Sequence, residues 1–390
     1  MRKITFKKTA RILVSALVAN AAGLSFVMVI FPPLGRKFGL SDLYMGSLIS
    51  ISALIMAITA LFWGFSCEKI GRKNILLTGF AVGSISLCGT ALTIFLVFNK
   101  IFSELTFFTL LFSVRLLQCA MTSGIMPASQ ALMADITTAD NRAKGMGLLG
   151  ASHGLGAIAG AALAWRMAGS ILMALLSLAF LLAISFLAIF FFMQDGHAPR
   201  PRYQVSQSFS FKAILPRLIV TFLGVTCYSI LQQATTLRLQ DALHYSIEQS
   251  ISRGGAILML SAFAMVMSQL FLVRISAWTP QRLLGSGSIL AFFSMGFLAA
   301  AQNYSEILAA TIFFGLSLGL MLPGNLALLS RSVGPYAQGK VAGINAVTQG
   351  LALASGPLIA ANLQPFSPAL PYWAALILLV PLCFTALFRS

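Results

Sequence analysis

Uninterrupted apolar runs of roughly 20 residues recur along the whole chain, for example at 12–34 and 171–192. Each run is long enough to cross the roughly 30 Å hydrocarbon core of a bilayer as a helix that rises about 1.5 Å per residue. A transmembrane barrel would instead show segments of about 10 residues in which apolar and polar side chains alternate. Because 58% of the residues are hydrophobic and only 9% are charged, a soluble globular domain is excluded. The sequence predicts an all-α membrane protein.

The apolar runs predict twelve transmembrane helices in two sets of six. We expect them at 12–34, 43–66, 74–98, 105–126, 144–164, 170–193, 214–237, 254–275, 283–301, 306–330, 340–362 and 370–388. A polar stretch with Gly196, Pro199 and Pro201 separates the two sets. The predicted organisation is therefore an N-terminal six-helix bundle at 1–193, a linker at 194–212 and a C-terminal six-helix bundle at 213–390.

Basic residues are distributed unequally between the two sides that twelve spans would create. Of the 26 Lys and Arg residues, 19 fall on the side of the N-terminus, six on the other side, and Arg115 within a span. Since loops rich in Lys and Arg stay in the cytoplasm, we expect both termini and the linker to be cytoplasmic, in the inner (plasma) membrane of a bacterium. Topology thus explains the net charge of +17, and nucleic acid is not expected as a partner.

The two sets of six spans show signs of an internal repeat. When the sequence is shifted by 196 residues, identical residues coincide: Pro127 with Pro323, Lys144 with Lys340, Gly147 with Gly343, Gly154 with Gly350 and Gly160 with Gly356. Two six-helix halves related by an axis along the membrane normal are a common design of secondary transporters. In that design the substrate binds near the membrane midplane, between the halves.

The loop between the second and third spans carries the motif GFSCEKIGRK at 64–73. Gly71 would permit a tight turn there, and by itself the string could be only a basic topology anchor. The motif closely resembles the loop signature of the major facilitator superfamily, G-x-L-a-D-r-x-G-r-k. The matching residues are Gly64, Lys69, Gly71, Arg72 and Lys73, with Glu68 in place of the usual Asp. The resemblance implies a gating charge cluster that also includes Asp135, at the end of the fourth span, and Arg142.

Two further patterns resemble those of the same superfamily. In the fourth span, RLLQC at 115–119 is similar to R-x-x-Q-G, with Cys119 at the glycine position. In the fifth span, Gly147, Gly156 and Gly160 resemble the antiporter signature G-x8-G-x3-G-P, although Ala161 replaces the proline. The Gly-Pro pair that ends this signature occurs instead in the second half, at Gly356-Pro357. The resemblance implies the twelve-helix fold of a drug or metabolite proton antiporter, with close helix packing at these glycines.

Polar side chains at membrane depth are costly and therefore mark candidate substrate or coupling sites. Arg115 is expected about 15 Å into its span, where it either serves binding and coupling or donates to backbone carbonyls and locks the bundle. His153, at a similar depth, is either a satisfied core histidine or a titratable residue that lines a cavity. The uncharged candidates are Asn20, Gln118, Gln232, Gln233, Asn345 and Gln349, the last being the repeat partner of His153.

None of the nine acidic residues is expected in the middle of a span. Many proton-coupled drug exporters of the superfamily carry a carboxylate there, which also attracts cationic drugs. A cationic or neutral cavity instead favours an anionic or neutral polar metabolite, siderophore or drug. Proton coupling would then have to use His153 or an interface carboxylate such as Asp42 or Glu104.

The sequence therefore predicts a secondary active transporter that moves a small organic molecule by alternating access. Proton-coupled efflux is the first expectation, and uptake of an organic anion such as a carboxylate siderophore, by a symporter or facilitator, is the alternative. A non-transporting receptor would not need polar midplane residues, and no nucleophile–base pair, metal-ligand cluster or phosphate loop indicates an enzyme. We expect no cofactor or metal other than the proton gradient as an energy source. We also expect a monomer whose partners are the substrate and the lipid bilayer.

Overall fold

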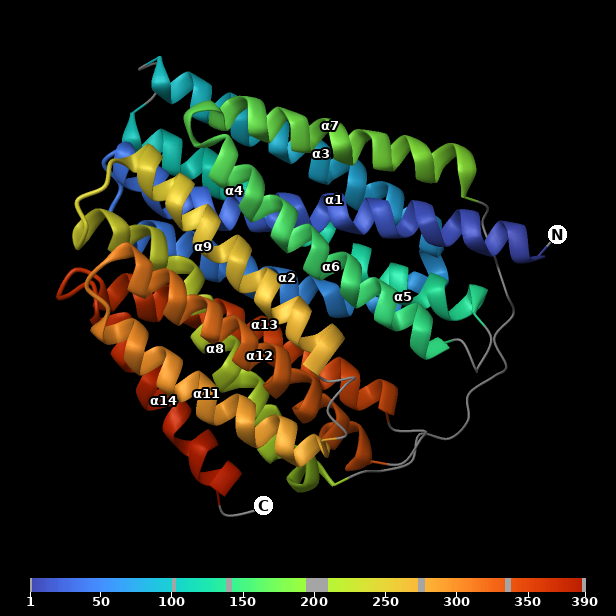
Figure 1. The fold of residues 1–390 in the computed structure, drawn as a ribbon. Coiled ribbons are helices and arrows are strands. Elements are labelled where there is room, and N and C mark those ends of the chain that lie inside the picture. Colours follow the sequence, from blue (N-terminus) through green and yellow to red (C-terminus); the bar gives the residue numbers. More distant parts are fainter. Residues whose placement is uncertain are drawn as a thin grey trace. The chain divides into compact units, whose positions relative to one another are not determined.

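The computed structural model describes residues 2–99, 103–137, 142–193, 210–272, 278–333 and 338–387. Within these ranges every regular element is a helix (Figure 1), which confirms the expected all-α fold. Most of the expected linker at 194–212 lies outside them. The side chains of Glu68, Glu104 and Arg142 are also outside the described part of the chain.

The helices follow the expected spans closely. They are α1 (Arg2–Lys37), α2 (Asp42–Ile70), α3 (Arg72–Phe98), α4 (Glu104–Thr122), α5 (Ile125–Ile136), α6 (Arg142–Arg166) and α7 (Ile171–Phe192), then α8 (Phe211–Asp241), α9 (Ile247–Met267), α11 (Pro280–Ala300), α12 (Tyr304–Arg331), α13 (Gln338–Leu363) and α14 (Leu370–Leu387). A short 3-10 helix (Ala168–Ser170) precedes α7, and a π-helix (Ser268–Leu272) follows α9. In the described residues, 11 segments are long and apolar enough to cross a membrane, and Leu370–Cys383 is a shorter apolar helix.

The fourth span is longer than expected, because helix α4 continues through a kink into α5. The expected helix ended at residue 126, immediately before Pro127, whereas the apolar span runs from Leu105 to Ile136. Pro127 occupies the first turn of α5, where a backbone N–H has no intrahelical partner and its loss costs little. Ser123 and Gly124, at the junction, both keep right-handed helical backbone angles. The break is therefore a kink within one span.

Contacts divide the chain into two compact units, 1–40 with 51–200, and 41–50 with 201–390. Helix α2 is thus shared, since its first residues group with the second unit. A Cβ placed on Gly46 would lie 2.9 Å from the carbonyl oxygen of Pro357 and 2.5 Å from Cβ of Ala361, so this approach requires glycine.

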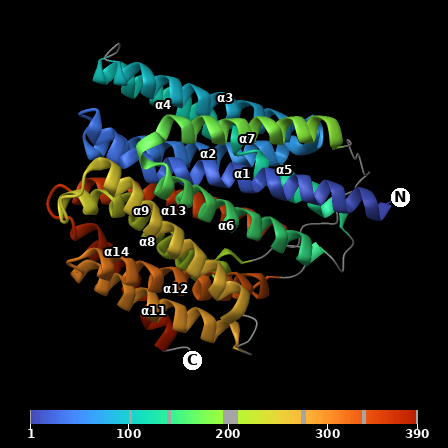
Figure 2. The ribbon, with the colours of Figure 1, turned by 45° about the horizontal axis from the view of Figure 1, so that its top comes forward.

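The two units share one pattern of helix pairing, as the expected repeat requires. In the first unit α1 packs on α6, and α3 packs on α7 and α4; Figures 1 and 2 both show α6 beside α1 and α3 beside α7. In the second unit α8 packs on α13, and α11 packs on α14 and α12. This correspondence confirms two six-helix repeats.

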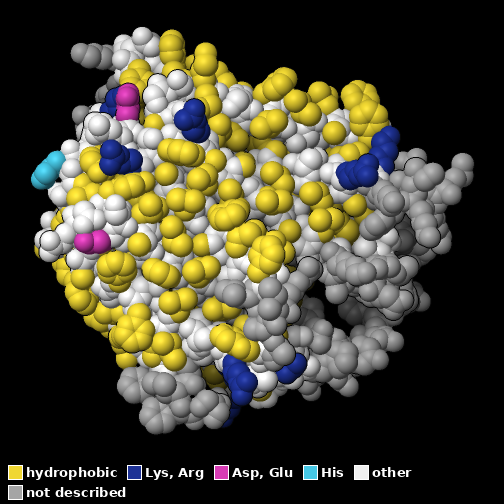
Figure 3. All heavy atoms as spheres, viewed as in Figure 1, with side chains coloured by type: hydrophobic (Ala, Val, Ile, Leu, Met, Phe, Trp, Pro, Cys, Tyr) yellow, Lys and Arg dark blue, Asp and Glu magenta, His cyan; other side chains and the backbone are white. Residues whose placement is uncertain are grey.

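Large apolar side chains cover much of the outer surface. Helix α7 exposes Met173, Phe180 and Phe191 by 66–70% while it buries Leu175 and Leu178 in the first unit. Figure 3 shows one face that is largely hydrophobic, with most of its charged side chains near the margins. An apolar surface of this extent is unfavourable in water and suits contact with lipid chains.

Candidate functional site

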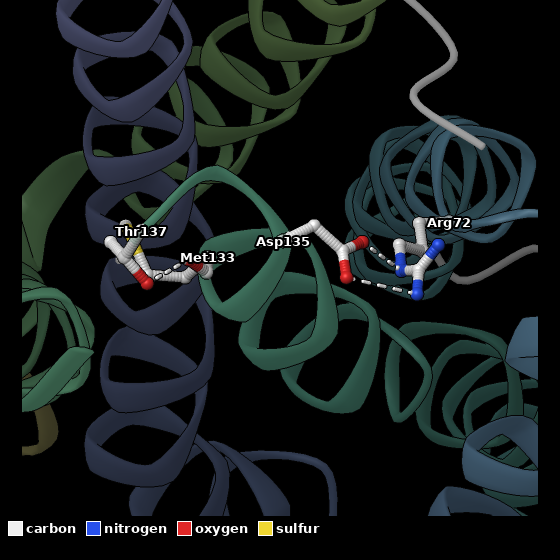
Figure 4. Close-up of polar contacts among 4 residues, drawn as sticks. All are labelled: Arg72, Met133, Asp135 and Thr137. Atoms are coloured by element: carbon white, nitrogen blue, oxygen red, sulfur yellow. Dashed lines mark hydrogen bonds and ion pairs between the residues drawn. The ribbon is translucent and has the colours of Figure 1, made fainter. Parts of the chain in front are cut away.

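Arg72 and Asp135 form a bidentate ion pair between the first turn of α3 and the last turn of α5 (Figure 4). Nε of Arg72 lies 2.7 Å from Oδ2 of Asp135, and Nη2 donates to Oδ1 at 3.2 Å. The two side chains are only 12% and 13% exposed, so water screens the pair weakly. The planar guanidinium matches the carboxylate with two parallel contacts, which a lysine cannot do.

The structure also describes several other residues of the 64–73 motif. Gly71, which precedes α3, has φ 88° and ψ 143°, a conformation that favours glycine. Gly64 and Lys69 are exposed, and Lys73 is partly exposed. The structure therefore brings together Arg72 and Asp135 of the expected charge cluster, whereas the side chains of Glu68 and Arg142 lie outside its description.

Arg115 is fully enclosed in the first unit, with 1% of its surface exposed. Its Nη1 donates to Oε1 of Gln118 at 2.7 Å, and its guanidinium lies 5.8 Å from the ring centroid of Phe31 on α1. Nε of Arg115 has no hydrogen-bond partner among the described residues. The described contacts of Arg115 therefore include no hydrogen bond to a backbone carbonyl of another helix. Its guanidinium, which is always charged, keeps one buried N–H donor without a partner among the described residues.

His153 and Asn20 lie on the neighbouring helices α6 and α1. His153 is exposed and Asn20 partly exposed, so His153 is not part of the buried core of the first unit. The structure records no bond between His153 and Arg115.

The second unit holds most of the uncharged candidates. Gln232 donates to the hydroxyl of Tyr228 at 3.2 Å, while Gln233 is 2% exposed and its Nε2 has no partner in the described part. Asn345 accepts a hydrogen bond from Thr221 at 2.8 Å. Gln349 is exposed, as is His153, its repeat partner on α6.

A buried network around Thr221 was not expected from the sequence. Nδ2 of Asn325 donates to Oγ1 of Thr221 at 3.0 Å and to the backbone oxygen of Arg217 at 2.9 Å. Together with the bond from Thr221 to Asn345, it joins α8, α12 and α13. The sequence had placed Asn345 among the substrate candidates, and the structure shows that its amide oxygen is used within the protein.

Four of the five motif residues expected in helix packing are buried at helix contacts. A Cβ on Gly156 would lie 2.5 Å from the carbonyl oxygen of Val18, and one on Gly160 would lie 2.9 Å from the backbone nitrogen of Phe26. In the second unit, Gly356 faces Ser229 and Ile230 in the same way, and Pro357 is buried beside it. Gly147 differs, because no atom lies within 4 Å of the position its Cβ would take. Packing in this structure therefore does not require glycine at 147, contrary to expectation.

Arg238 is the main buried polar residue that sequence analysis missed. We expected it in a loop, but it lies in the last turns of α8 and is 3% exposed. Its guanidinium donates to three carbonyl oxygens at the end of α11, those of Leu298 at 2.6 Å, Ala299 at 3.4 Å and Ala301 at 2.5 Å. It also lies 4.9 Å from the ring centroid of Tyr372 on α14. Arg238 thus caps the end of one helix from another, with a charge that suits the helix dipole.

The acidic residues lie at helix ends wherever the structure describes their helices. Asp42, Glu248 and Glu306 are in first turns, and Asp135 and Asp241 are in last turns. No span among the described residues therefore carries a carboxylate at mid-depth, whereas Arg115 is a cation ten residues after the start of its span.

Comparison with known proteins agrees with this architecture. The family model of the Major Facilitator Superfamily matches residues 13–357. Multidrug resistance protein 2 of Bacillus subtilis (strain 168) is 25% identical over 396 aligned residues, which cover 97% of this chain and 94% of that protein. The multi-drug resistance efflux pump PmrA homolog of Lactococcus lactis subsp. lactis (strain IL1403) is 24% identical over 363 residues, with 90% and 85% covered.

A solved structure supports the fold independently. The crystal structure of a bacterial homolog of the human lysosomal transporter Spinster, in an inward-facing and occupied conformation, matches with a TM-score of 0.76. The match covers 98% of this chain and 96% of that chain at 13% sequence identity, so it is a likeness of fold. With its apolar helices, paired repeats and family match, this chain is an integral membrane transporter, not an enzyme, and belongs to the major facilitator superfamily.

Proposed function

We propose that this transporter exports a small anionic or neutral polar organic molecule in exchange for protons. The observation that carries the substrate class is Arg115, a buried guanidinium whose Nε lacks a partner among the described residues. An unpaired buried donor on a cation costs free energy that a carboxylate, phosphate or carbonyl oxygen of a ligand would recover. The names of the relatives, multidrug resistance protein 2 and a multi-drug resistance efflux pump homolog, support export.

The distribution of acidic residues supports the same substrate class. A lipophilic cation crossing the membrane needs a negative partner at depth, and all nine acidic residues lie at helix ends or outside the described helices. The transported molecule would be a metabolite, a siderophore or an anionic or neutral drug.

We further propose that both termini lie in the cytoplasm of a bacterial cell and that the protein works as a monomer in the inner membrane. The excess of Lys and Arg on the side of the N-terminus supports this orientation. In that orientation the Arg72–Asp135 pair lies at the cytoplasmic ends of α3 and α5.

Everted membrane vesicles with an acidic interior test direction, coupling and substrate class together. Vesicles that contain the protein are energised, and anionic, neutral and cationic compounds are added in turn while a fluorescent dye reports the pH gradient. We expect anionic or neutral compounds to dissipate the gradient in a protein-dependent manner, and an uncoupler to abolish their accumulation. A response to lipophilic cations alone would refute the proposed substrate class, and entry of substrate that an uncoupler leaves unchanged would favour the facilitator alternative.

Replacing Arg115 with alanine is expected to abolish this transport, since no other described residue supplies a buried cation in that part of the first unit. Arg115→Lys should restore little activity, because a point charge cannot reproduce a planar fork. The measurement is the initial rate of substrate-driven proton movement, normalised to the amount of protein in the membrane. Arg166→Ala, which removes an exposed arginine of the same unit, should transport normally. Substantial activity in Arg115→Ala would show that the substrate does not depend on this charge.

His153→Gln is expected to retain binding while it changes the pH dependence of transport. Glutamine copies Gln349, the repeat partner of His153, and keeps hydrogen-bonding capacity but does not titrate. Rates measured between about pH 5.5 and 8 test this, since that range brackets the ordinary titration of histidine. A pH profile identical to that of the parent protein would leave Asp42 or Glu104 as candidates for the proton site.

Arg72→Ala is expected to slow transport about tenfold without reducing the amount of inserted protein. The variant leaves Asp135 without its bidentate partner, and a charge-assisted hydrogen bond is worth roughly 1.5–3 kcal/mol. Arg331→Ala, which removes an exposed charge in the last turn of α12, serves as the control. Equal transport rates in the two variants would argue against a gating role for the ion pair.

A further inference from the structure

Ser52 on α2 faces the fourth span, which is the span that carries Arg115. Thr59 and Trp63, seven and eleven positions after Ser52, lie on the same face of α2 as Ser52 does. Both contact the fourth span: Oγ1 of Thr59 lies 2.9 Å from Oγ of Ser123, and Nε1 of Trp63 donates to the backbone oxygen of Ala120 at 2.7 Å. Ser52 continues this line of contact two turns before Thr59.

Cys119 connects Ser52 with Arg115. It follows Arg115 by four residues on α4, so the two side chains lie on one face of that helix. Its thiol interacts with the charge of Arg115 and with the hydroxyl of Ser52. The contact with Ser52 lacks hydrogen-bond geometry, and the hydroxyl has no hydrogen-bond partner among the described residues. The three residues, each at most 2% exposed, therefore border one buried polar region of the first unit.

The hydroxyl of Ser52 differs from those of nearby helical residues, because it does not bond to its own helix. Thr59 donates to the backbone oxygen of Ile55 at 2.6 Å, and Thr90 on α3 donates to that of Ser86 at 2.9 Å. Such bonds satisfy a hydroxyl within an apolar helix. Ser52 is 1% exposed and makes none. A buried hydroxyl without a partner costs free energy, which a ligand with an acceptor oxygen would recover.

The charge and the free donors of this region suit a single carboxylate. Arg115 provides one permanent positive charge, and the unpartnered donors are its Nε and the hydroxyl of Ser52. No described span carries a carboxylate at mid-depth that would balance this charge. A monocarboxylate balances it and brings two acceptor oxygens. A phosphate dianion would leave a net negative charge near the buried ring of Phe31, where a low dielectric makes it unfavourable.

We propose that Ser52 is a second substrate-binding residue of this transporter and that the exported molecule is a monocarboxylate. One carboxylate oxygen accepts a hydrogen bond from Nε of Arg115, and the other accepts from the hydroxyl of Ser52. This inference rests on the proposed function, because it places the ligand at the same guanidinium. A carboxamide of the same shape lacks the charge and should bind weakly, since charge-assisted hydrogen bonds are the stronger ones.

The test measures ligand binding to the purified full-length protein at about pH 8, where carboxylates are ionised. Benzoate, 2-naphthoate and decanoate are titrated, each beside its amide, together with the dianion phenylphosphonate. The rise of the thermal unfolding midpoint with ligand concentration gives each dissociation constant. We expect at least one carboxylate to bind about tenfold or more tightly than its amide and than phenylphosphonate. Ser52→Ala should weaken its binding about tenfold and leave the midpoint without ligand unchanged.

Two further variants separate binding from folding. Ser52→Thr keeps the hydroxyl and should keep most of the affinity. Ser185→Ala removes a buried hydroxyl of the same unit that donates to the backbone oxygen of Leu181 at 2.8 Å, and it should bind as the parent protein does. If Ser52→Ala does not fold, Ser52→Cys replaces it, because a thiol fills the space but donates weakly; parent affinity in that variant would remove Ser52 from the site.

Failure of this inference is distinguishable from failure of the proposed function. Loss of carboxylate binding in Arg115→Ala but not in Ser52→Ala would exclude Ser52 and leave the proposed function intact. Equal weakening in Ser52→Ala and Ser185→Ala would also exclude a specific contact with Ser52. If no carboxylate bound more tightly than its amide, the monocarboxylate assignment would be overturned. Parent affinity in Arg115→Ala would instead contradict the proposed function itself, whatever Ser52→Ala does.

Discussion

Replacing Arg238 with alanine is expected to lower the thermal unfolding midpoint by about 10 °C. The variant leaves the carbonyl oxygens of Leu298 and Ala301 without their charged donor at the buried end of α11. Breaking a buried, charge-assisted set of this kind typically costs roughly 3–5 kcal/mol, and 1 kcal/mol shifts the midpoint of a unit of this size by about 2–4 °C. The loss of packing against Tyr372 on α14 adds to this cost.

Two further arginine variants isolate the cause of this effect. Arg238→Lys keeps the charge but cannot reach three carbonyl oxygens with a planar fork, so it should fall between alanine and the parent protein. Arg253→Ala removes an arginine that also lies on a tyrosine ring, 4.3 Å from the centroid of Tyr245, but is exposed. Its midpoint should change little. Similar midpoints for Arg238→Ala and Arg253→Ala would mean that the helix cap contributes no measurable stability.

Arg238 also shows why sequence reasoning located some buried polar groups and missed others. Arg238 lies just beyond the predicted end of a span, so the count of basic residues on each side of the membrane assigned it to a loop. That count uses only the position of a residue in the sequence. Its partners are backbone oxygens about 60 residues further along the chain, and backbone groups leave no signature in the sequence. Asn325 was missed for a related reason, since its partners Thr221 and the backbone oxygen of Arg217 become neighbours only when α8 and α12 pack.

Features set by local sequence were predicted well. Apolar length determined the predicted spans. The resemblance of the 64–73 motif to the superfamily signature implied Asp135 as a partner, and Asp135 does meet Arg72 in the structure. The fourth span was expected to end at residue 126, whereas it continues through Pro127 to Ile136. A proline is tolerated in the first turn of a helical segment that follows a kink, so its presence does not by itself end a span.

The sequence also predicted that Arg115 lies within a span, but it did not predict which residues contact it. The sequence correctly placed Arg115 within a span, since an apolar run that contains one arginine requires a sheltered position for it. Burial against Phe31, with a bond to Gln118, depends on the packing of α1 against the fourth span. The sequence also suggested a site shared by Arg115 and His153; the histidine is exposed on α6, and the shared site stays a prediction.

Leucine at Gly160 or Gly356 is expected to eliminate transport and to reduce the yield of folded protein severely. At Gly160 even a Cβ would lie 2.9 Å from the backbone nitrogen of Phe26, and at Gly356 it would lie 2.8 Å from that of Ile230. Backbone atoms cannot rotate away as a side chain can, so the helix pairs α1–α6 and α8–α13 would have to separate. Overpacking of a core typically costs about 1–3 kcal/mol, and a collision with backbone belongs at or above the upper end.

Gly147 and Gly343 provide a control on the same two helices and in the same repeat relation. No atom lies within 4 Å of a Cβ at either position, so leucine there adds a side chain without moving a helix in this structure. Folded yield and thermal midpoint of all four leucine variants, measured by size-exclusion chromatography with fluorescence detection, separate helix packing from the general intolerance of membrane helices to substitution. Loss at 160 and 356 with retention at 147 and 343 would assign the cost to the two backbone contacts. Equal loss of folded yield in all four variants would show that the close contacts at Gly160 and Gly356 do not cause the loss, since Gly147 and Gly343 make no such contacts.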